Sequence, residues 1–243
     1  PDRVEIIGAT ELGALHGLST LERMAINNQG KVIAQSTVDG PQLSTRALHI
    51  AIMIKADSDK ATTSTFVSTN DVMGAIHQAR LHNYNALILM LTDRVVLETY
   101  GGVNSNQNWS KEQFLEVIAY AQENGLEFIP EIKFLNKVNR YFPGFPDGLL
   151  YNYDTYNPQN GEDVYEKLVF KIIDELAELH HSVYGSQLKL KPIKAIHIGH
   201  DEVAGHNKET QETLSSLGQA MLPPDLFLSD VIKLNNHIKS KGL

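Results

Sequence analysis

Four short apolar runs recur along the chain. They are dominated by aliphatic residues and occupy residues 47–56, 86–93, 126–134 and 193–203. Each run has the length and the hydrophobicity of a strand that is buried on both faces, as the strands of parallel sheets are. The runs therefore predict four parallel strands.

Helical periodicity fills the intervals between these runs. The first helix is predicted to begin at Asn70–Asp71, and the second to begin at its cap Ser110 and to end at Gly125. Longer helical patterns cover residues 161–181 and 229–241. Strand and helix thus alternate four times, which predicts an α/β fold of βα units joined by right-handed crossovers.

Two segments stand outside this alternation. In the first 44 residues, Val4–Ile7 and Gln29–Gln35 resemble strands and Leu12–Ile26 has helical periodicity. We expect them to form the edge of a smaller α/β domain. The other segment, Asn139–Asn160, is rich in Tyr, Phe, Pro, Gly and Asn. Such a composition is typical of a packed cover or of a surface that stacks on sugars.

Carboxylates follow three of the predicted strands at the point where each strand ends. Asp93 ends the second predicted strand, and Glu131 lies at the end of the third. Asp201 and Glu202 end the fourth. In (β/α)8 barrels the carboxyl ends of the strands carry the active site. Any one of these acids can also be explained as a cap of the following helix, so the inference rests on their repetition.

The fourth run reads KAIHIGHDEV from residue 194. Alternation along a strand divides its side chains into two sets, one packed on helices and one facing the barrel axis. The first set is Ile196, Ile198 and His200, and the second is His197, Gly199 and Asp201. Glu202 would then stand at the rim of the barrel. At an inward position His197 is either a hydrogen-bonded core residue or a ligand.

Two adjacent carboxylates suit proton chemistry. A neighbouring negative charge raises the pKa of a carboxyl group, so one acid can keep its proton near neutral pH while the other stays charged. A metal site is the alternative, because His197, His200 and His206 accompany the two acids. The spacing is not that of a helical HExxH motif, and alternate residues of a strand do not all converge. We therefore predict no metal and no cofactor.

Composition argues against several other classes of function. The net charge is −8 without a basic stripe, so nucleic acid is not an expected partner. No run of eighteen apolar residues occurs, so no membrane span is expected. Cysteine is absent, which excludes disulfides, thiol catalysis and cysteine-based zinc sites. The chain begins PDRVEI, without an initiator Met or a signal peptide, so the sequence assigns no compartment.

Five motifs occur in one order along the chain. They are GLSTL at 17–21, TRALHI at 45–50, NALILMLTD at 85–93, LEFIPEI at 126–132 and HIGHDEV at 197–203. Together they resemble the glycoside hydrolases of family 20, the β-N-acetylhexosaminidases. That family has a GLxTL helix in a small α/β domain, followed by barrel strands with WRG-like, HLTD, IPE and HxGGDE motifs.

The resemblance implies a fold for each part of the chain. Residues 1–44 would be the C-terminal part of the small α/β domain. Residues 45–243 would be the N-terminal half of the catalytic TIM barrel, its first four βα units. A secreted, periplasmic or lysosomal-like location is implied in the same way.

The resemblance also implies a mechanism. In family 20 the nucleophile is the 2-acetamido oxygen of the substrate itself. By the match of HIGHDEV, Glu202 would be the general acid that protonates the glycosidic oxygen and later the base that acts on water. Asp201 would stay charged, orient the acetamido N–H and stabilise the oxazolinium-like intermediate. The expected partner is a glycan that contains N-acetylhexosamine.

Four further residues are expected to bind the substrate: Arg46, Asp93, His197 and Glu131. By the match of TRALHI, Arg46 would bind hydroxyls of the terminal sugar, because a bidentate guanidinium suits vicinal hydroxyls. Asp93 would support the sugar or the general acid at the floor of the pocket.

Four positions depart from the motifs of the family. His200 replaces the second Gly of HxGGDE, and Ala51, Met90 and Lys133 stand where the family has Asp, His and an acidic residue. These departures keep open a noncatalytic carbohydrate-binding or assembly protein with a decayed half-barrel. An unrelated barrel enzyme of sugar metabolism is a third interpretation. We also expect the open strand edges of half a barrel to favour self-association.

Overall fold

The centre of the molecule is a parallel three-stranded sheet. The structure is a computed structural model, and it describes residues 3–52, 67–91, 95, 97–99, 109–138, 142, 145–181, 189–200, 203 and 208–243. The strands are β1 (Ala47–Ala51), β2 (Ala86–Leu91) and β3 (Glu127–Ile132), in the order β1-β2-β3. The three predicted strands in this part of the chain, and their parallel direction, are confirmed.

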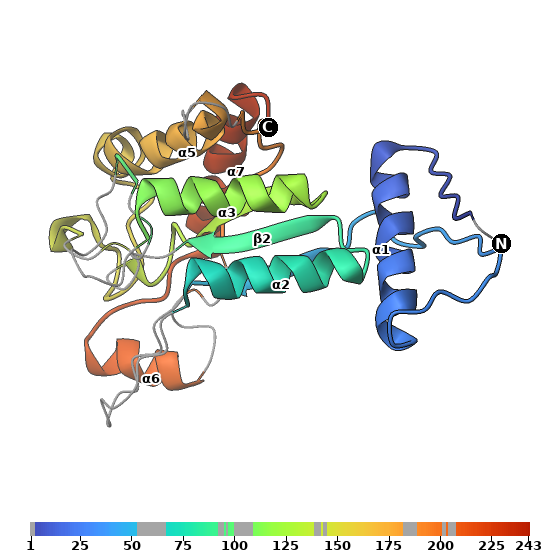
Figure 1. Cartoon of the computed structure of the whole chain (residues 1–243). Coiled ribbons are helices and arrows are strands. Elements are labelled where there is room, and N and C mark those ends of the chain that lie inside the picture. The colour runs from blue at the N-terminus through green and yellow to red at the C-terminus, as the bar shows by residue number, and fades with distance from the viewer. Residues whose placement is uncertain are drawn as a thin grey trace.

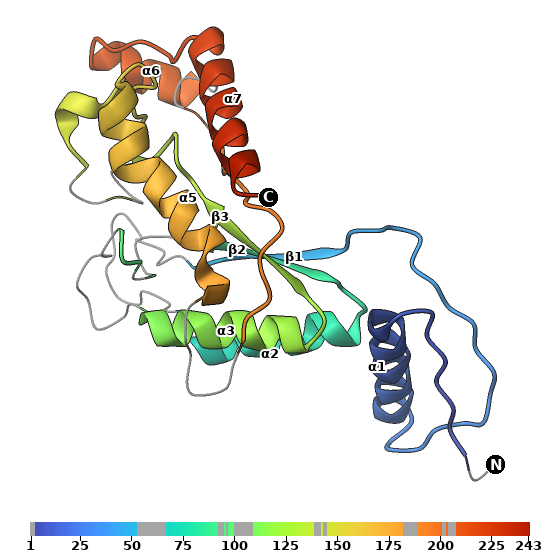
Figure 2. The ribbon, with the colours of Figure 1, turned by 90° about the horizontal axis from the view of Figure 1, so that it is seen from above.

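Two helices cover one face of this sheet. They are α2 (Thr69–Leu81) and α3 (Lys111–Glu123), which lie side by side in both views (Figures 1 and 2). Each begins with a capping box, in which a serine accepts a hydrogen bond from the backbone three residues later. The two pairs are Ser68 with Asp71 and Ser110 with Gln113. A capping box satisfies backbone donors that the first turn leaves free, which explains why both helices begin close to the predicted residues.

The two faces of the sheet differ in burial. Under α2 and α3, the side chains of Leu87, Leu89 and Phe128 are almost completely buried. The register and the alternation of the strands direct a second set of side chains to the opposite face, which we call the inner face. This set is His49, Ala51, Ile88, Met90, Ile129 and Glu131. His49 is exposed, and Ile88 and Ile129 are half-buried, so this face is only partly covered by the described residues.

The predicted fourth strand is reduced to a single bridge. His197 pairs with Glu131 in the parallel sense, through a bond from His197 N to Pro130 O and one from Ile132 N to His197 O. The side and the direction of the predicted pairing are therefore right, but the described residues 193–200 form one bridge with β3 where a ladder was predicted. Gly199 has a φ of +60°, which ends the extended conformation two residues after the bridge.

The chain after β3 forms further helices. The predicted helix over 161–181 consists of a π-helix, η2 (Glu162–Val169), then α5 (Phe170–Ala177) and the 3-10 turn η3 (Leu179–His181). The last helix, α7 (Pro224–Ser240), begins five residues before the predicted start because Pro224 occupies its first turn. A helix that was not predicted, α6 (Lys208–Ser216), precedes it.

The aromatic segment between β3 and the π-helix is a packed cover. It includes the 3-10 turn η1 (Asp147–Leu149) and a bridge between Leu150 and Tyr156. Phe142, Phe145 and Tyr156 are buried in the core cluster. These three rings therefore pack in the core and do not form an exposed surface that stacks on sugars.

The N-terminal segment contains one helix and no strand among its described residues. Helix α1 (Glu11–Asn27) confirms the helical prediction, but Val4–Ile7 and Gln29–Gln35 form no strand, so those two predictions are wrong. A strand requires a partner for its backbone groups, and neither segment pairs with a described neighbour. Figure 1 shows α1 beyond the end of the sheet that is opposite the arrowheads of the strands.

A buried arginine joins α1 to α2. Arg80, in the last turn of α2, donates hydrogen bonds to the hydroxyl of Ser19, at 3.3 Å, and to the carboxylate of Glu22. Ser19 is completely buried, and the Arg80 side chain is 10% exposed. A charge-assisted bond in such a position contributes more than one at the surface. We therefore regard Arg80 as the main polar contact between α1 and the sheet layer.

Replacing Arg80 with Met should loosen α1 without unfolding the sheet. The bond to Glu22 is worth about 1.5–3 kcal/mol, so amide exchange within residues 11–27 should accelerate by about tenfold or more. Arg23→Met is the matched control, because Arg23 bonds only to Thr20 within α1. Equal exchange in the two variants would contradict the role of Arg80.

Candidate active site

Two imidazoles meet one buried carboxylate on the inner face of the sheet. Oε2 of Glu131 lies 2.6 Å from Nε2 of His49 and 3.5 Å from Nδ1 of His197. The Glu131 side chain is 2% exposed, whereas the side chains of His49 and His197 are 53% and 50% exposed. Neither contact has the alignment of a hydrogen bond, so the buried Oε2 of Glu131 has no hydrogen-bond partner among the described residues. The two rings are 6.4 Å apart and tilted by 39°.

The positions of these residues follow from the strands. Glu131 is the last residue but one of β3, and its bridge to His197 brings the fourth run alongside. His49 comes from β1, two strands away, and its long side chain crosses the inner face. The structure thus brings together the predicted site residues Glu131 and His197. His49 was not predicted, although its alternation with Leu48 and Ile50 in β1 was a usable signal.

Arg46, which was predicted to bind hydroxyls of the terminal sugar, lies away from this cluster. It precedes the first residue of β1, so it stands at the amino edge of the sheet, whereas Glu131 stands at the carboxyl edge. Its guanidinium donates to the backbone carbonyls of Asn83, at 2.7 Å, and Leu43, at 2.6 Å. These bonds hold the chain segments before β1 and β2 together, which is a structural role.

The other three predicted residues, Asp93, Asp201 and Glu202, lie outside the residues that the structure describes. The described chain nevertheless approaches them closely in sequence. His200 immediately precedes Asp201, and Leu91 closes β2 two residues before Asp93.

Gly199 is needed where the fourth run meets the end of β3. A Cβ atom at this position would lie 2.9 Å from the carbonyl oxygen of Ile132 and 3.0 Å from Cα of Lys133. Both are backbone atoms, which do not move aside as the tip of a flexible side chain does. The close contact of Gly199 is therefore with the end of the neighbouring strand β3.

His200 points away from the inner face and into a buried polar network. Its Nε2 lies 2.5 Å from Oδ2 of Asp230, and its Nδ1 lies 2.8 Å from the carbonyl oxygen of Ile198. Oδ1 of Asp230 accepts hydrogen bonds from the hydroxyls of Tyr156, at 2.7 Å, and Tyr165. The outward direction predicted for His200 agrees with this contact. Its partners were not predicted, because no local pattern links residues so far apart.

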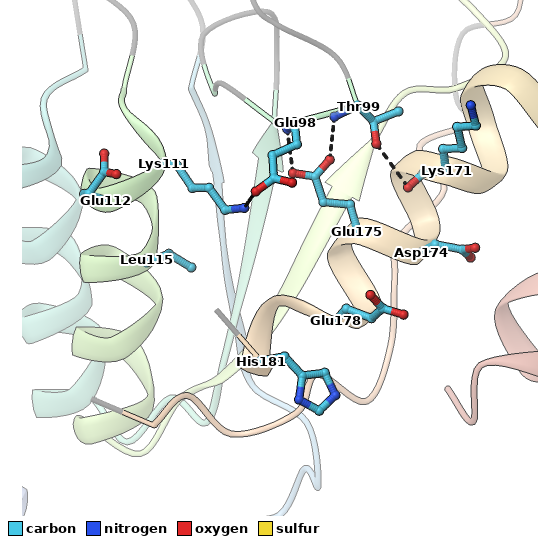
Figure 3. A pocket seen from close by; sticks show the side chains of 10 residues that line it. All are labelled: Glu98, Thr99, Lys111, Glu112, Leu115, Lys171, Asp174, Glu175, Glu178 and His181. Atoms are coloured by element: carbon cyan, nitrogen blue, oxygen red, sulfur yellow. Dashed lines mark hydrogen bonds and ion pairs between the residues drawn. The ribbon is translucent and has the colours of Figure 1, made fainter. Parts of the chain in front are cut away.

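A hollow of about 670 Å³ lies between α3 and α5, away from the inner face. Figure 3 shows that part of its polar lining is engaged in contacts. The Glu175 carboxylate accepts backbone N–H groups of Glu98, at 2.7 Å, and Thr99, at 2.8 Å, and Lys111 pairs with Glu98. The lining contains none of the predicted site residues, so we do not treat the hollow as a second candidate for the active site.

Two classes of site are not found in the described part of the chain. Its His, Asp and Glu side chains form no group of three that could hold a metal ion. Its helices include none that is long and apolar enough to cross a membrane.

Comparisons with known proteins agree with the fold. The profile described as Glycosyl hydrolase family 20, catalytic domain, matches residues 62–222. A plant relative, Beta-hexosaminidase 3 of Arabidopsis thaliana, is 22% identical over 218 residues, which are 84% of this chain and 37% of that protein. The match to the family profile covers more than half of the chain.

Solved structures of similar fold come from several bacteria. The Streptomyces plicatus N-acetyl-beta-hexosaminidase is 19% identical with a TM-score of 0.59, covering 95% of this chain and 46% of that one. The Flavobacterium johnsoniae chitobiase is 17% identical with a TM-score of 0.64, covering 96% and 36%. The chain thus spans less than half the length of these relatives.

The match over residues 62–222 includes the segments that follow β1, β2 and β3 and the HIGHDEV motif. The chain therefore belongs to glycosyl hydrolase family 20. Its fold is the α/β fold of these TIM-barrel enzymes.

Gly199→Ala should disturb the end of the fourth run. The left-handed conformation alone costs an alanine about 1–2 kcal/mol, and the clash with the β3 backbone should add to that cost. Gly218→Ala is the matched control, because Gly218 has a φ of +66° with no atom within 4 Å of the added carbon. Urea unfolding should show the larger loss for Gly199→Ala; equal losses would mean that the close approach to Ile132 costs nothing.

Proposed function

We propose that this chain carries part of the active site of a β-N-acetylhexosaminidase, a glycosidase that removes terminal β-linked N-acetylhexosamine from glycans. The observation that carries the proposal is the family match over residues 62–222, because that range contains Asp93, Asp201 and Glu202. The names of a plant relative and of the Streptomyces structures point to the same class of substrate.

The proposed fold assignment is finer than the family alone. Residues 45–243 would form the first four βα units of a (β/α)8 barrel, within a longer enzyme, and residues 1–44 the C-terminal part of a small α/β domain. The parallel order β1-β2-β3 and the bridge from Glu131 to His197 support the barrel. The place of α1 beyond the amino ends of the strands supports a separate N-terminal unit (Figure 1).

The proposed mechanism is retaining and substrate-assisted. The 2-acetamido oxygen of the substrate attacks the anomeric carbon while Glu202 donates a proton to the leaving oxygen. Asp201 stays charged, orients the acetamido N–H and stabilises the oxazolinium-like intermediate. Water then opens the intermediate, with Glu202 acting as the base.

The inner face supports this mechanism with two described residues. Glu131 and His197 lie near the carboxyl end of the sheet, where barrel enzymes bind substrate. We propose that the half-exposed imidazole of His197, with Glu131 beneath it, contacts the sugar, and that Asp93 supports the sugar or the general acid. Because the guanidinium of Arg46 is bound to backbone carbonyls at the amino edge, we do not propose that it binds the sugar.

Glu202→Gln should separate substrates by their leaving groups. A glutamine has no proton to give, so hydrolysis of an alkyl N-acetylglucosaminide should fall by about 10²–10⁴-fold, the size of a general-acid contribution. A nitrophenyl glycoside needs little protonation and should lose less. Glu123→Gln, an exposed change at the end of α3, is the control. Equal losses on both substrates would show that Glu202 is not the acid.

Asp201→Asn should affect the acetamido group. Removing the charge should slow N-acetyl substrates and weaken binding of a thiazoline analogue of the intermediate by about tenfold or more, as expected for a lost charge-assisted bond. Calorimetric titration of the full-length protein with the thiazoline measures this directly. Unchanged affinity for the analogue would exclude substrate assistance by Asp201.

A noncatalytic carbohydrate-binding protein is the second candidate. One row of the inner face favours it: Ala51 pairs with Met90, and Met90 pairs with Glu131. Ala51 and Met90 stand where the motifs of the family have Asp and His, so this row carries only one polar side chain. Binding of N-acetylglucosamine without turnover of any N-acetylhexosaminide would support this candidate over the enzyme.

Self-association is a further proposal about partners. The inner face is only partly covered by described residues, and β1 is an edge strand of the described sheet. Unpaired edges and apolar faces favour pairing with another chain. Light scattering on the native protein would measure its mass in solution.

A further inference from the structure

A completely buried carboxylate lies behind the end of the fourth run. Asp230, in α7, has no exposed surface, and Tyr156 and Tyr165 beside it are equally hidden. A carboxylate in such a place is costly unless donors surround it. Burial, followed by the charge of Asp230, raises the pKa of both tyrosines, so both hydroxyls keep their protons and donate to Oδ1.

The remaining oxygen of Asp230 determines the orientation of His200. A carbonyl oxygen only accepts, so Nδ1 of His200 carries the proton that is shared with Ile198 O at 2.8 Å. The other ring nitrogen, Nε2, forms a hydrogen bond of 2.5 Å with Oδ2 of Asp230. The ring is therefore held at both nitrogens. The edge of the ring of Phe227, at 5.8 Å between centroids, also packs against it.

These contacts join four segments that are far apart in sequence. Tyr156 ends the cover after β3, Tyr165 lies in the π-helix, Asp230 lies in α7, and His200 ends the described part of the fourth run. Within the described residues 193–200 of the fourth run, only His197 forms a bridge to the sheet, so ladder hydrogen bonds do not hold His200. The network supplies the missing attachment.

We propose that His200 and Asp230 form a positioning pair, which fixes the backbone from which Asp201 and Glu202 continue. The inference rests on the proposed function, in which Asp201 and Glu202 are the catalytic acids. His200 immediately precedes these two acids, so holding His200 helps to position them. A glycine at position 200, as in the motif of the family, has no side chain for such an anchor. In this chain the anchor passes through α7, outside the inner face, and neither His200 nor Asp230 contacts the sugar.

Asp230→Asn tests the pair with little change of shape. The amide oxygen can still accept from both tyrosines, and the amide nitrogen can donate a neutral hydrogen bond to Nε2 of His200, which replaces the charge-assisted contact with a weaker one. In the full-length protein, amide exchange at residues 197–200 should accelerate about tenfold, and kcat on a nitrophenyl N-acetylglucosaminide should fall about 10- to 100-fold, as small misplacements of catalytic groups do. KM should change by less than about threefold, because groups that bind the sugar are not touched.

Asp174→Asn is the matched control. Asp174, in α5, also pairs with a histidine of α7, at 2.7 Å from Nε2 of His237, and with Lys241 at 2.8 Å. Partial burial alone would raise its pKa, but the hydrogen bonds from Lys241 and His237 hold that pKa below the usual range. This pair joins α5 to α7, and neither residue contacts the described part of the fourth run. It should leave both the exchange at 197–200 and kcat unchanged.

His200→Phe removes the anchor and His200→Gln restores part of it. Phenylalanine keeps a ring but offers no donor to Oδ2 of Asp230, whereas the amide nitrogen of glutamine can donate to that oxygen. His200→Gln should therefore show slower exchange at 197–200 and a higher kcat than His200→Phe, a difference that general destabilisation by any change at this position does not produce.

The outcomes separate the inference from the proposed function. Faster exchange at 197–200 and a lower kcat in Asp230→Asn and in His200→Phe but not in Asp174→Asn, with a smaller effect in His200→Gln, support the positioning pair. Equal effects in Asp230→Asn and Asp174→Asn, or none in either, overturn it. If the wild-type protein hydrolyses no N-acetylhexosaminide, the proposed function fails, and unchanged exchange in Asp230→Asn would then overturn the anchor as well.

Discussion

The burial of one carboxylate constrains much of the C-terminal half of the chain. Asp230 has no exposed surface, so its two oxygens must find donors within the protein. They find them in the loop after β3, in the π-helix and at the end of the fourth run. Each of these segments is thereby held against α7. A change in any of the three donors would leave a buried acceptor without its partner, which is more costly than the bond itself.

The inner face has the opposite character. Its carboxylate, Glu131, is buried, but the two imidazoles above it are half exposed and free to meet a ligand. Buried acid and open imidazoles form a polar floor at the carboxyl end of a parallel sheet, while the face under α2 and α3 is wholly apolar. The same strands therefore carry the core on one side and the candidate chemistry on the other, as alternation of side chains requires.

The sequence predicted those parts of the fold that depend on local patterns. Three strands follow from apolar runs, and helices α2 and α3 follow from helical periodicity and from the start signals at Asn70–Asp71 and Ser110. Local patterns fail where a distant partner decides. Val4–Ile7 has the residues of a strand but no described strand beside it.

The candidate site shows the same division. Glu131 and His197 could be predicted because the carboxyl ends of parallel strands meet. Arg46 was matched by motif alone, and its place before β1 puts it at the amino edge. The partner of His200 lies thirty residues further along the chain, beyond the reach of any helix or strand period.

The π-helix has a consequence for how this segment tolerates change in length. Two contacts have a spacing of five residues: the rings of Tyr165 and Phe170 have centroids 5.5 Å apart, and the backbone N–H of Phe170 donates to the carbonyl oxygen of Tyr165. An α-helix would bring together residues three or four apart. Deleting one residue between Tyr165 and Phe170 would restore the α-helical spacing but rotate Tyr165 away from Asp230. The π-helix therefore contains one residue more than an α-helix with the same contacts would need. Losing that residue would shift more contacts than many substitutions would.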